Sequence, residues 1–300
     1  MKKTLLFAFS LLLSTGLAFS QEEEEKDTIP NGWTREGNIQ LLFNQSAFNK
    51  EWTGGGTSSI AGNLSVDYQF NYKMDDFTWN NRIFGNYGLT KVKDDEFTRK
   101  TSDRLELNSI AGKQIQNSNW YYSWFLNFRT QFAKGYEFSE DPDTGETIRT
   151  EISDFMSPAY LQTGPGIMWK KSDDLFFNFA PATARFIFVH KDFTSGPGYV
   201  DGDYFGVDEG ESMRFELGAS LSGYSKYEIM ENVAMEHTIS LYSNYLDKPG
   251  NIDIDYLLNI EMGINEYLSA NFVFQAVYDD NAVGAFQIRE VFGLGINYGF

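Results

Sequence analysis

The 300-residue chain contains no cysteine. If the chain is exported, it must be held together by something other than disulfides, such as a large core or a closed sheet in lipid. After residue 20 the chain also lacks any apolar stretch that approaches twenty residues. A helix that crosses a membrane needs about twenty such residues, so a helical membrane protein is excluded.

Positive charge is scarce as well. The 24 Lys and Arg residues stand against 42 Asp and Glu, which gives a formal net charge of −18. This acidity argues against binding nucleic acid or anionic lipid through a basic face, so no nucleic-acid partner is expected. Only 2 histidines are present, and no phosphate loop, metal-binding motif or redox centre is recognisable. No cofactor is therefore expected.

Aromatic residues and glycine are abundant. Phe, Trp and Tyr make up 17% of the chain, and there are 27 glycines. So many aromatic side chains argue against disorder. An acidic, cysteine-free chain with this composition is typical of an outer-membrane β-barrel.

The first twenty residues have the pattern of a secretory signal peptide. Lys2 and Lys3 precede the apolar run Leu5–Leu17, and Ala18-Phe19-Ser20 offers small residues at alternate positions for signal peptidase. A membrane anchor is the alternative, but the run is too short for a stop-transfer helix. No cysteine follows the run, which excludes a lipid-anchored lipoprotein. We predict a signal peptide over residues 1–20, an acidic, disordered lead-in over 21–36 and a barrel over 37–300.

After the lead-in, hydrophobic side chains alternate with polar ones. Leu64, Val66 and Tyr68, for example, alternate with Ser65 and Asp67. Only a strand with one apolar face and one wet face has this period of two. Several such segments are long enough to cross a bilayer at a tilt. We predict an all-β protein, a transmembrane antiparallel up-and-down barrel of about twelve strands, at residues 37–46, 58–73, 76–92, 100–115, 119–134, 155–170, 174–190, 212–227, 232–246, 250–265, 267–279 and 285–300.

The predicted connections alternate in length. Short turns such as 74–75 and 116–118 are followed by connections that are mostly longer, at residues 47–57, 93–99, 135–154 and 191–211. A barrel with short periplasmic turns and longer outer loops has this pattern, and both termini then lie on the periplasmic side. Pro165 and Pro181 interrupt the ladder of one strand pair and indicate bulges there.

The last predicted strand indicates a location. Large apolar side chains alternate with Gly and Asn up to the terminal residue, at Phe292, Leu294, Ile296, Tyr298 and Phe300. An alternating strand that ends in Phe resembles the insertion signal bound by the outer-membrane assembly machinery during biogenesis. Together with the signal peptide, it predicts a cell-envelope protein in the outer membrane of a Gram-negative bacterium, surrounded by outer-membrane lipid.

Several short segments are similar to a known family. They are Gly32-Trp33-Thr34-Arg35-Glu36-Gly37-Asn38, Asn44-Gln45-Ser46-Ala47-Phe48, Asn119-Trp120-Tyr121-Tyr122, Phe128-Arg129-Thr130-Gln131-Phe132, Ser157-Pro158-Ala159-Tyr160 and Ser243-Asn244-Tyr245-Leu246-Asp247. In combination they resemble an uncharacterised outer-membrane β-barrel family common in Bacteroidota, a domain of unknown function, over roughly residues 27–300. The resemblance implies a barrel in the cell envelope. It brings no catalytic residues.

Charged residues within the strands are expected to face the lumen, because a charge facing the lipid midplane costs a few kcal/mol. These candidate pore-lining residues are Arg82, Arg104, Glu106, Arg129, Arg185, Arg214, Glu216, Glu236, Asp253, Asp255, Glu261 and Arg289. The arginines lie mainly on early strands and the acids mainly on late ones. One interpretation is a transverse field across a narrow pore, which selects zwitterionic or polar solutes. The other is a salt-bridge network that braces and plugs the lumen.

An enzyme is a weaker hypothesis. His237 falls in the apolar register, where it could lie on the outer wall as in an outer-membrane phospholipase, but Thr238-Ile239-Ser240 lacks the sequence that would supply a nucleophile. His190 lies at a strand end. Both histidines fit an interfacial or structural role better, and no catalytic residue is assigned.

The outer connections are acidic. Clustered carboxylates suit Ca²⁺, and Asp201, Asp203 and Asp208 are weak candidates. Their spacing matches no EF-hand loop, and a solvated surface is the simpler interpretation.

Three functions follow from the sequence. The leading one is a passive, porin-like channel or binding barrel for a small polar solute. The alternatives are a structural, envelope-organising barrel with a plugged lumen, and an outer-membrane hydrolase.

Overall fold

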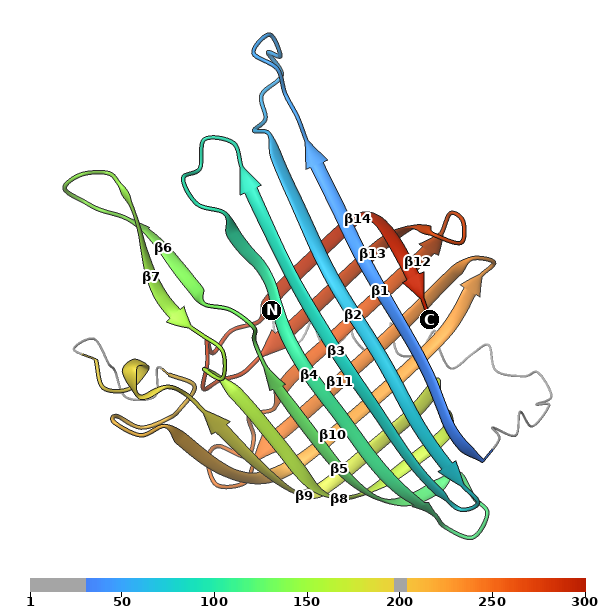
Figure 1. The fold of residues 1–300 in the computed structure, drawn as a ribbon. Coiled ribbons are helices and arrows are strands. Elements are labelled where there is room, and N and C mark those ends of the chain that lie inside the picture. The colour runs from blue at the N-terminus through green and yellow to red at the C-terminus, as the bar shows by residue number, and fades with distance from the viewer. Residues whose placement is uncertain (1–30, 197–203) are drawn as a thin grey trace. The chain divides into compact units, whose positions relative to one another are not determined.

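The structure is a computed structural model that describes residues 31–196 and 204–300. The predicted signal peptide and the lead-in up to residue 30 lie outside the described residues. Within Gly32–Phe300, which forms one unit, twelve strands close an antiparallel barrel whose last strand pairs with the first (Figure 1). The predicted fold class is confirmed.

The barrel strands lie close to their predicted positions. They are β1 (Gly32–Ser46), β2 (Ser59–Met74), β3 (Phe77–Val92), β4 (Arg99–Gln114), β5 (Trp120–Thr130), β8 (Ala159–Ser172), β9 (Leu175–Phe188), β10 (Met213–Met230), β11 (Val233–Asn244), β12 (Asp253–Gly263), β13 (Leu268–Tyr278) and β14 (Gln287–Gly299). β1 begins earlier than predicted, because Trp33 packs on Tyr72 and Trp79 with ring centroids 5.2 and 5.8 Å away. Residues 32–36, predicted to lie in the lead-in, therefore belong to the barrel.

The structure adds a hairpin that the sequence does not predict. β6 (Gly135–Glu140) and β7 (Thr147–Ser153) pair with each other within the predicted loop 135–154. Gly145, with φ of 71°, lies in the turn between them, and Phe138 packs on Phe97 with ring centroids 5.7 Å apart. The next long connection contains the 3-10 helix η1 (Lys191–Phe193). Among the described residues, no helix is long and apolar enough to cross a membrane.

Apolar side chains cover the outside of the barrel. Phe292, Leu294 and Ile296 of β14, for example, are each more than half exposed, and similar side chains alternate along the other strands. A water-soluble protein rarely exposes such a continuous apolar surface, whereas a barrel in a bilayer needs one. Closure of the sheet pairs backbone groups that lipid cannot satisfy. The chain is therefore a membrane-spanning β-barrel.

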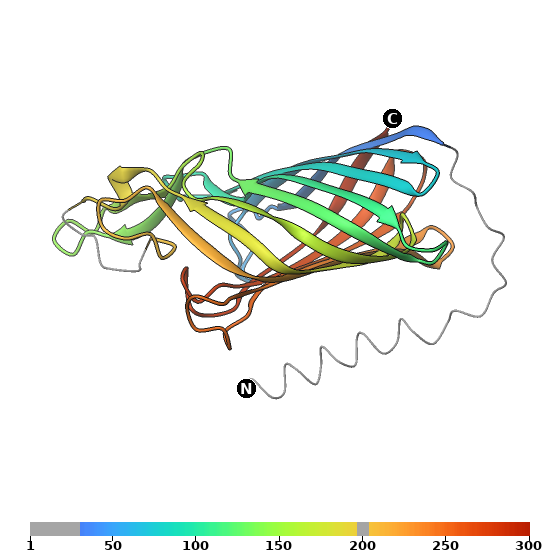
Figure 2. The ribbon, with the colours of Figure 1, turned by 90° about the horizontal axis from the view of Figure 1, so that it is seen from below.

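The two ends of the barrel differ (Figure 2). One end, the loop end, carries the long connections with the β6–β7 hairpin and η1. The other, the turn end, carries the short turns, the start of β1 and the end of β14. Trp33, Trp79, Trp120 and Tyr267 are exposed near the turn end. This arrangement is typical of the aromatic girdle at a membrane–water interface.

The proline-containing ladder is irregular. The register of β8 against β9 shifts between Thr163 and Ile167, on either side of Pro165. The register of β10 against β9 shifts between Gly218 and Ser220, opposite residues that flank Pro181. Since proline cannot donate a hydrogen bond to a ladder, these shifts are the predicted bulges.

The closing seam between β1 and β14 is short. β1 pairs with β2 from Gly32 to Ser46, but its ladder with β14 runs only from Asn38–Gly299 to Phe43–Leu294. Towards the loop end, the Asn44 side chain donates a hydrogen bond to the Phe292 carbonyl at 3.1 Å in place of a further ladder bond. The half of β14 nearer the loop end is consequently held by its ladder with β13 and by the Asn44 side chain.

We expect this half of the seam to exchange amide hydrogens first. The Phe300 amide donates to Gly37, so the amides of even-numbered residues in β14 point towards β1. Those of Ile288, Glu290 and Phe292 lie beyond the end of the ladder, and should exchange faster than those of Leu294, Ile296 and Tyr298. Hydrogen exchange of the barrel in detergent, read by NMR, measures this difference. Equal protection along β14 would contradict it.

Candidate functional site

The polar faces of the strands enclose a cavity of about 760 Å³ in the lumen. Its lining extends from Asn297 and Phe300 near the turn end to Phe205 and Gln287 near the loop end. Charged residues of both signs border it: Glu36, Asp67, Asp103, Glu236, Asp255, Glu261 and Asp279, together with Arg82, Arg104, Arg129, Lys226 and Arg289. With seven acids against five bases, the lining is mixed rather than of one sign.

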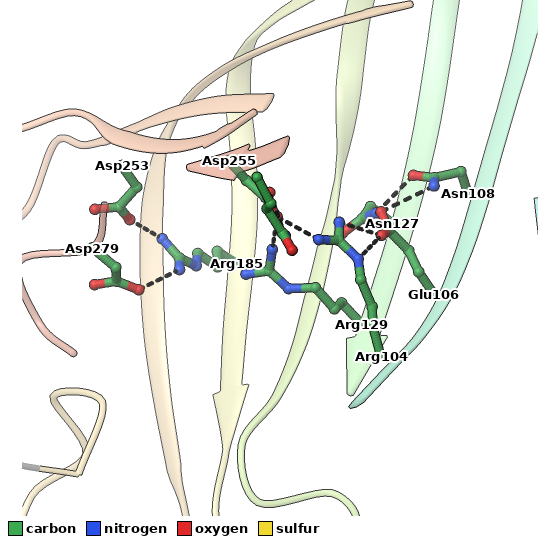
Figure 3. Close-up of polar contacts among 10 residues, drawn as sticks. Arg104, Glu106, Asn108, Asn127, Arg129, Arg185, Asp253, Asp255 and Asp279 are labelled. Carbon is green, nitrogen blue, oxygen red and sulfur yellow. Dashed lines mark hydrogen bonds and ion pairs between the residues drawn. The ribbon is translucent and has the colours of Figure 1, made fainter. Parts of the chain in front are cut away.

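One cluster of ion pairs crosses the lumen from β4 and β5 to β12 (Figure 3). Arg104 Nη1 lies 2.9 Å from the Asp255 carboxylate, and Arg129 pairs with the same carboxylate. Arg104 Nε also donates to Glu106 at 2.6 Å. Asn127 donates to Glu106 as well, at 2.7 Å. Two guanidiniums and two carboxylates thus neutralise each other, and we call this group the central crossbar.

A second crossbar, centred on Arg185 of β9, lies towards the loop end. Arg185 pairs with Asp253 and, at 3.3 Å, with Asp279, as Figure 3 also shows. Glu216 lies 3.6 Å from Arg185 and 2.8 Å from Arg214. Arg185 is only 2% exposed, and its guanidinium also lies over the rings of Tyr160 and Tyr242. This crossbar is the most deeply buried charge cluster among the described residues.

A third crossbar joins β3 to β11. Arg82 Nη2 donates to Glu236 at 2.7 Å, and Arg82 Nε donates to Asp67 at 2.9 Å. The guanidinium lies 5.4 Å from the centre of the Tyr224 ring. Because Asp67 and Glu236 lie on different strands, Arg82 links two walls of the barrel.

The cavity occupies one side of the lumen. Met168 of β8 and Asn178 and Thr183 of β9 are at most 1% exposed, and none of them borders the cavity. That side is therefore filled with packed side chains. Most of the cavity lining comes from β1 to β4 and β11 to β14, with a few residues from β5, β8 and β10, such as Arg129, Tyr160 and Tyr224.

The connection after η1 folds over the loop end of the lumen. Val207 is fully buried against Tyr160, Ile187 and Val189. Phe205 meets Tyr160 edge to face, with ring centroids 6.4 Å apart, and borders the cavity. The described part of this connection thus narrows the loop end.

The twelve charges singled out in the sequence all lie on the inward register. Those of the three crossbars are brought together, while Glu261 instead accepts a hydrogen bond from Asn297 at 2.8 Å. Arg289 borders the cavity without joining a crossbar. Among the charges of the crossbars, the sequence analysis missed Asp67 and Asp279; it also missed Glu36, Asp103 and Lys226, which border the cavity. Asp67 could have been found, since it occupies the polar register of its strand, whereas Asp279 follows the end of β13.

His237 lies on the outside of the barrel between two tyrosines. Its Nδ1 is 2.8 Å from the Tyr256 hydroxyl and its Nε2 is 3.2 Å from the Tyr227 hydroxyl. Ser225 of β10 lies opposite His237 in the ladder and is the nearest serine in register. Neither ring nitrogen of His237 contacts it, because both contact tyrosine hydroxyls. His190 follows the end of β9, and its backbone amide donates to Ser157.

The acidic loops offer little for a cation. Asp201 and Asp203 lie outside the described residues, and Asp208 lies in the connection after η1. In the β6–β7 turn, the backbone amides of Asp143 and Thr144 donate to Asp141 and lower the pKa of its carboxyl. Asp253, Asp279 and Asp280 could place one oxygen each within 4.8 Å of one another, but Arg185 already pairs with the first two.

The C-terminal strand presents its predicted insertion residues to the outside. Phe292, Leu294, Ile296, Tyr298 and Phe300 are all exposed by 57–61%. Phe300 continues the ladder through reciprocal backbone bonds with Gly37, and its ring stacks on Tyr68. The terminal residue is therefore part of the seam as well as of the apolar surface.

Comparison with known proteins gives one family model and several solved structures. A family model described as a protein of unknown function (DUF3078) matches residues 43–136, and no curated protein matches the chain. An outer-membrane channel of Pseudomonas putida F1 is similar in structure, at 11% identity and a TM-score of 0.39, over 93% of this chain and 99% of that one. The translocator domain of the autotransporter NalP from Neisseria meningitidis is 8% identical, with a TM-score of 0.39, over 100% of this chain and 96% of that one. The NanC porin is 11% identical, with a TM-score of 0.34, over 88% of this chain and 97% of that one. At these identities and TM-scores the likeness favours no particular function.

Proposed function

We propose that the barrel lies in the outer membrane of a Gram-negative bacterium and acts as a passive, porin-like channel or binding barrel for a small polar solute. The observation that carries this proposal is the cavity in the lumen, which charges of both signs border from the turn end to the loop end. A volume of about 760 Å³ falls in the range of small-molecule sites. The mixed charge favours a polar or zwitterionic solute over a simple ion.

The location rests on three features. The apolar outer wall requires a bilayer. The start of β1 and the end of β14 lie at the turn end, together with the short turns. The exposed residues of β14 have the alternation of an insertion signal. The turn end then faces the periplasm. Fractionation of cells, with the barrel recovered from outer rather than inner membranes, tests this.

The crossbars favour a second function, a structural barrel with a plugged lumen. Ion pairs such as Arg104–Asp255 and Arg82–Glu236 connect opposite walls and fill part of the lumen. A hydrolase has less support, because both ring nitrogens of His237 contact tyrosine hydroxyls.

Single-channel recording separates the first two functions. The purified barrel in a planar bilayer should give small, discrete conductance steps, because the crossbars leave only part of the lumen open. Heat-denatured protein from the same preparation is the control. A folded barrel that gives no steps would rule out the channel and favour the plugged structural barrel.

A further inference from the structure

Arg289 stands apart from the other arginines of the lumen. It lies on the inward register of β14, paired in the ladder with Gln275 of β13, and it borders the cavity. Its Nε and Nη1 are shielded from solvent and have no hydrogen-bond partner among the residues that the structure describes. The charged residue that acts on the Arg289 guanidinium is Arg104, which is also a cation and repels it.

Every other lumen arginine predicted from the sequence has a carboxylate partner. Arg82 has Glu236, Arg104 and Arg129 share Asp255, and Arg185 and Arg214 lie beside Glu216. Gln275, the neighbour of Arg289, turns its amide to Asp255 instead, at 3.2 Å. Asp255 is therefore occupied from three sides and does not serve Arg289.

Arg289 is half-buried, and its two shielded nitrogens are costly because these donors have lost water and gained no partner. Such a group persists more readily where a ligand supplies the missing acceptor. Guanidinium groups match carboxylates and phosphates in geometry and bind them through charge-assisted hydrogen bonds. The cavity beside Arg289 has room for such a group.

The surrounding charges indicate how much negative charge the site accepts. Arg104 and Arg129 are balanced by Glu106 and Asp255, so Arg289 adds a single uncompensated positive charge to this part of the lumen. A phosphate near neutral pH carries between one and two negative charges, and the second would face the Asp255 carboxylate. A singly charged carboxylate fits better.

We infer that Arg289 is the binding residue for the carboxylate group of a small monocarboxylate solute in the lumen. The inference rests on the proposed function and narrows its solute to a chemical class. The central crossbar lies next to this subsite and keeps its own charges neutral, so one guanidinium remains for the solute.

Titration calorimetry of the full barrel in detergent tests the inference with sodium acetate, sodium phosphate and tetramethylammonium chloride as probes. Acetate should bind, and Arg289→Gln should weaken its binding by about tenfold or more, as loss of a charge-assisted hydrogen bond does. Arg289→Lys should retain part of the affinity. Arg35→Gln is the matched control, because Arg35 is exposed on the outward register of β1 and its loss changes the net charge equally.

Equal acetate binding by wild type and Arg289→Gln would overturn the assignment of Arg289. Preference for phosphate over acetate would overturn the monocarboxylate class. A wild-type barrel that binds none of the probes would overturn the inference as well, while the channel itself would still be decided by its conductance. The change in gel mobility between unheated and heated samples shows whether each variant is folded.

Discussion

Replacing Arg185 with methionine is expected to lower the free energy of unfolding by about 3–5 kcal/mol, the range seen when one partner is removed from a buried ion pair. The guanidinium is 2% exposed and pairs with Asp253 and Asp279. Without it, Asp253 and Asp279 face each other with no cation between them, while Glu216 keeps its pair with Arg214. Urea unfolding of the barrel in lipid vesicles, followed by tryptophan fluorescence, measures the change.

Two further variants separate the loss of a partner from the loss of packing. Arg185→Met combined with Asp253→Asn and Asp279→Asn should recover much of the stability, because no unpaired charge then remains. Arg289→Met removes an arginine that has no carboxylate partner among the described residues, and it should leave the free energy of unfolding unchanged or raise it. If Arg185→Met and Arg289→Met unfold at the same urea concentration, the crossbar does not brace the barrel.

The sequence is enough to predict the strands and their inward faces. In the segment around Leu64 and Asp67, alternation decides which side chains meet lipid and which meet the lumen, and the short turns set the order of pairing. It is not enough to predict which charges pair. Arg82 and Glu236 are 154 residues apart, and their contact depends on the width of the barrel and the tilt of its strands.

Two features could not be predicted from the sequence, one for a local reason and one for a non-local reason. β6 and β7 are short, and their alternation over six and seven residues is hidden in a long acidic connection, although the turn around Gly145 carries hairpin residues. Arg289 has the same residue type and register as the paired arginines. Only the positions of carboxylates on other strands distinguish it, so its lack of a partner could not be predicted from alternation.

Removing the third crossbar as a neutral pair is expected to enlarge the conductance several-fold without changing ion selectivity. In Arg82→Ser with Glu236→Ser, one positive and one negative charge leave together, and two long side chains that join β3 to β11 across the cavity are replaced by short ones. Since the charge balance of the lining is kept, the effect is steric. Single-channel conductance in planar bilayers measures the first part, and the reversal potential in a salt gradient measures the second.

The single variants are the matched controls. Glu236→Ser alone leaves an extra positive charge in the lining, and Arg82→Ser alone leaves Asp67 and Glu236 without their shared guanidinium. The reversal potential should therefore shift towards anion selectivity in the first and towards cation selectivity in the second. A folded double variant with wild-type conductance would mean that this crossbar does not limit the passage. The narrowest point would then lie at the central crossbar, where Asp255 holds Arg104 and Arg129.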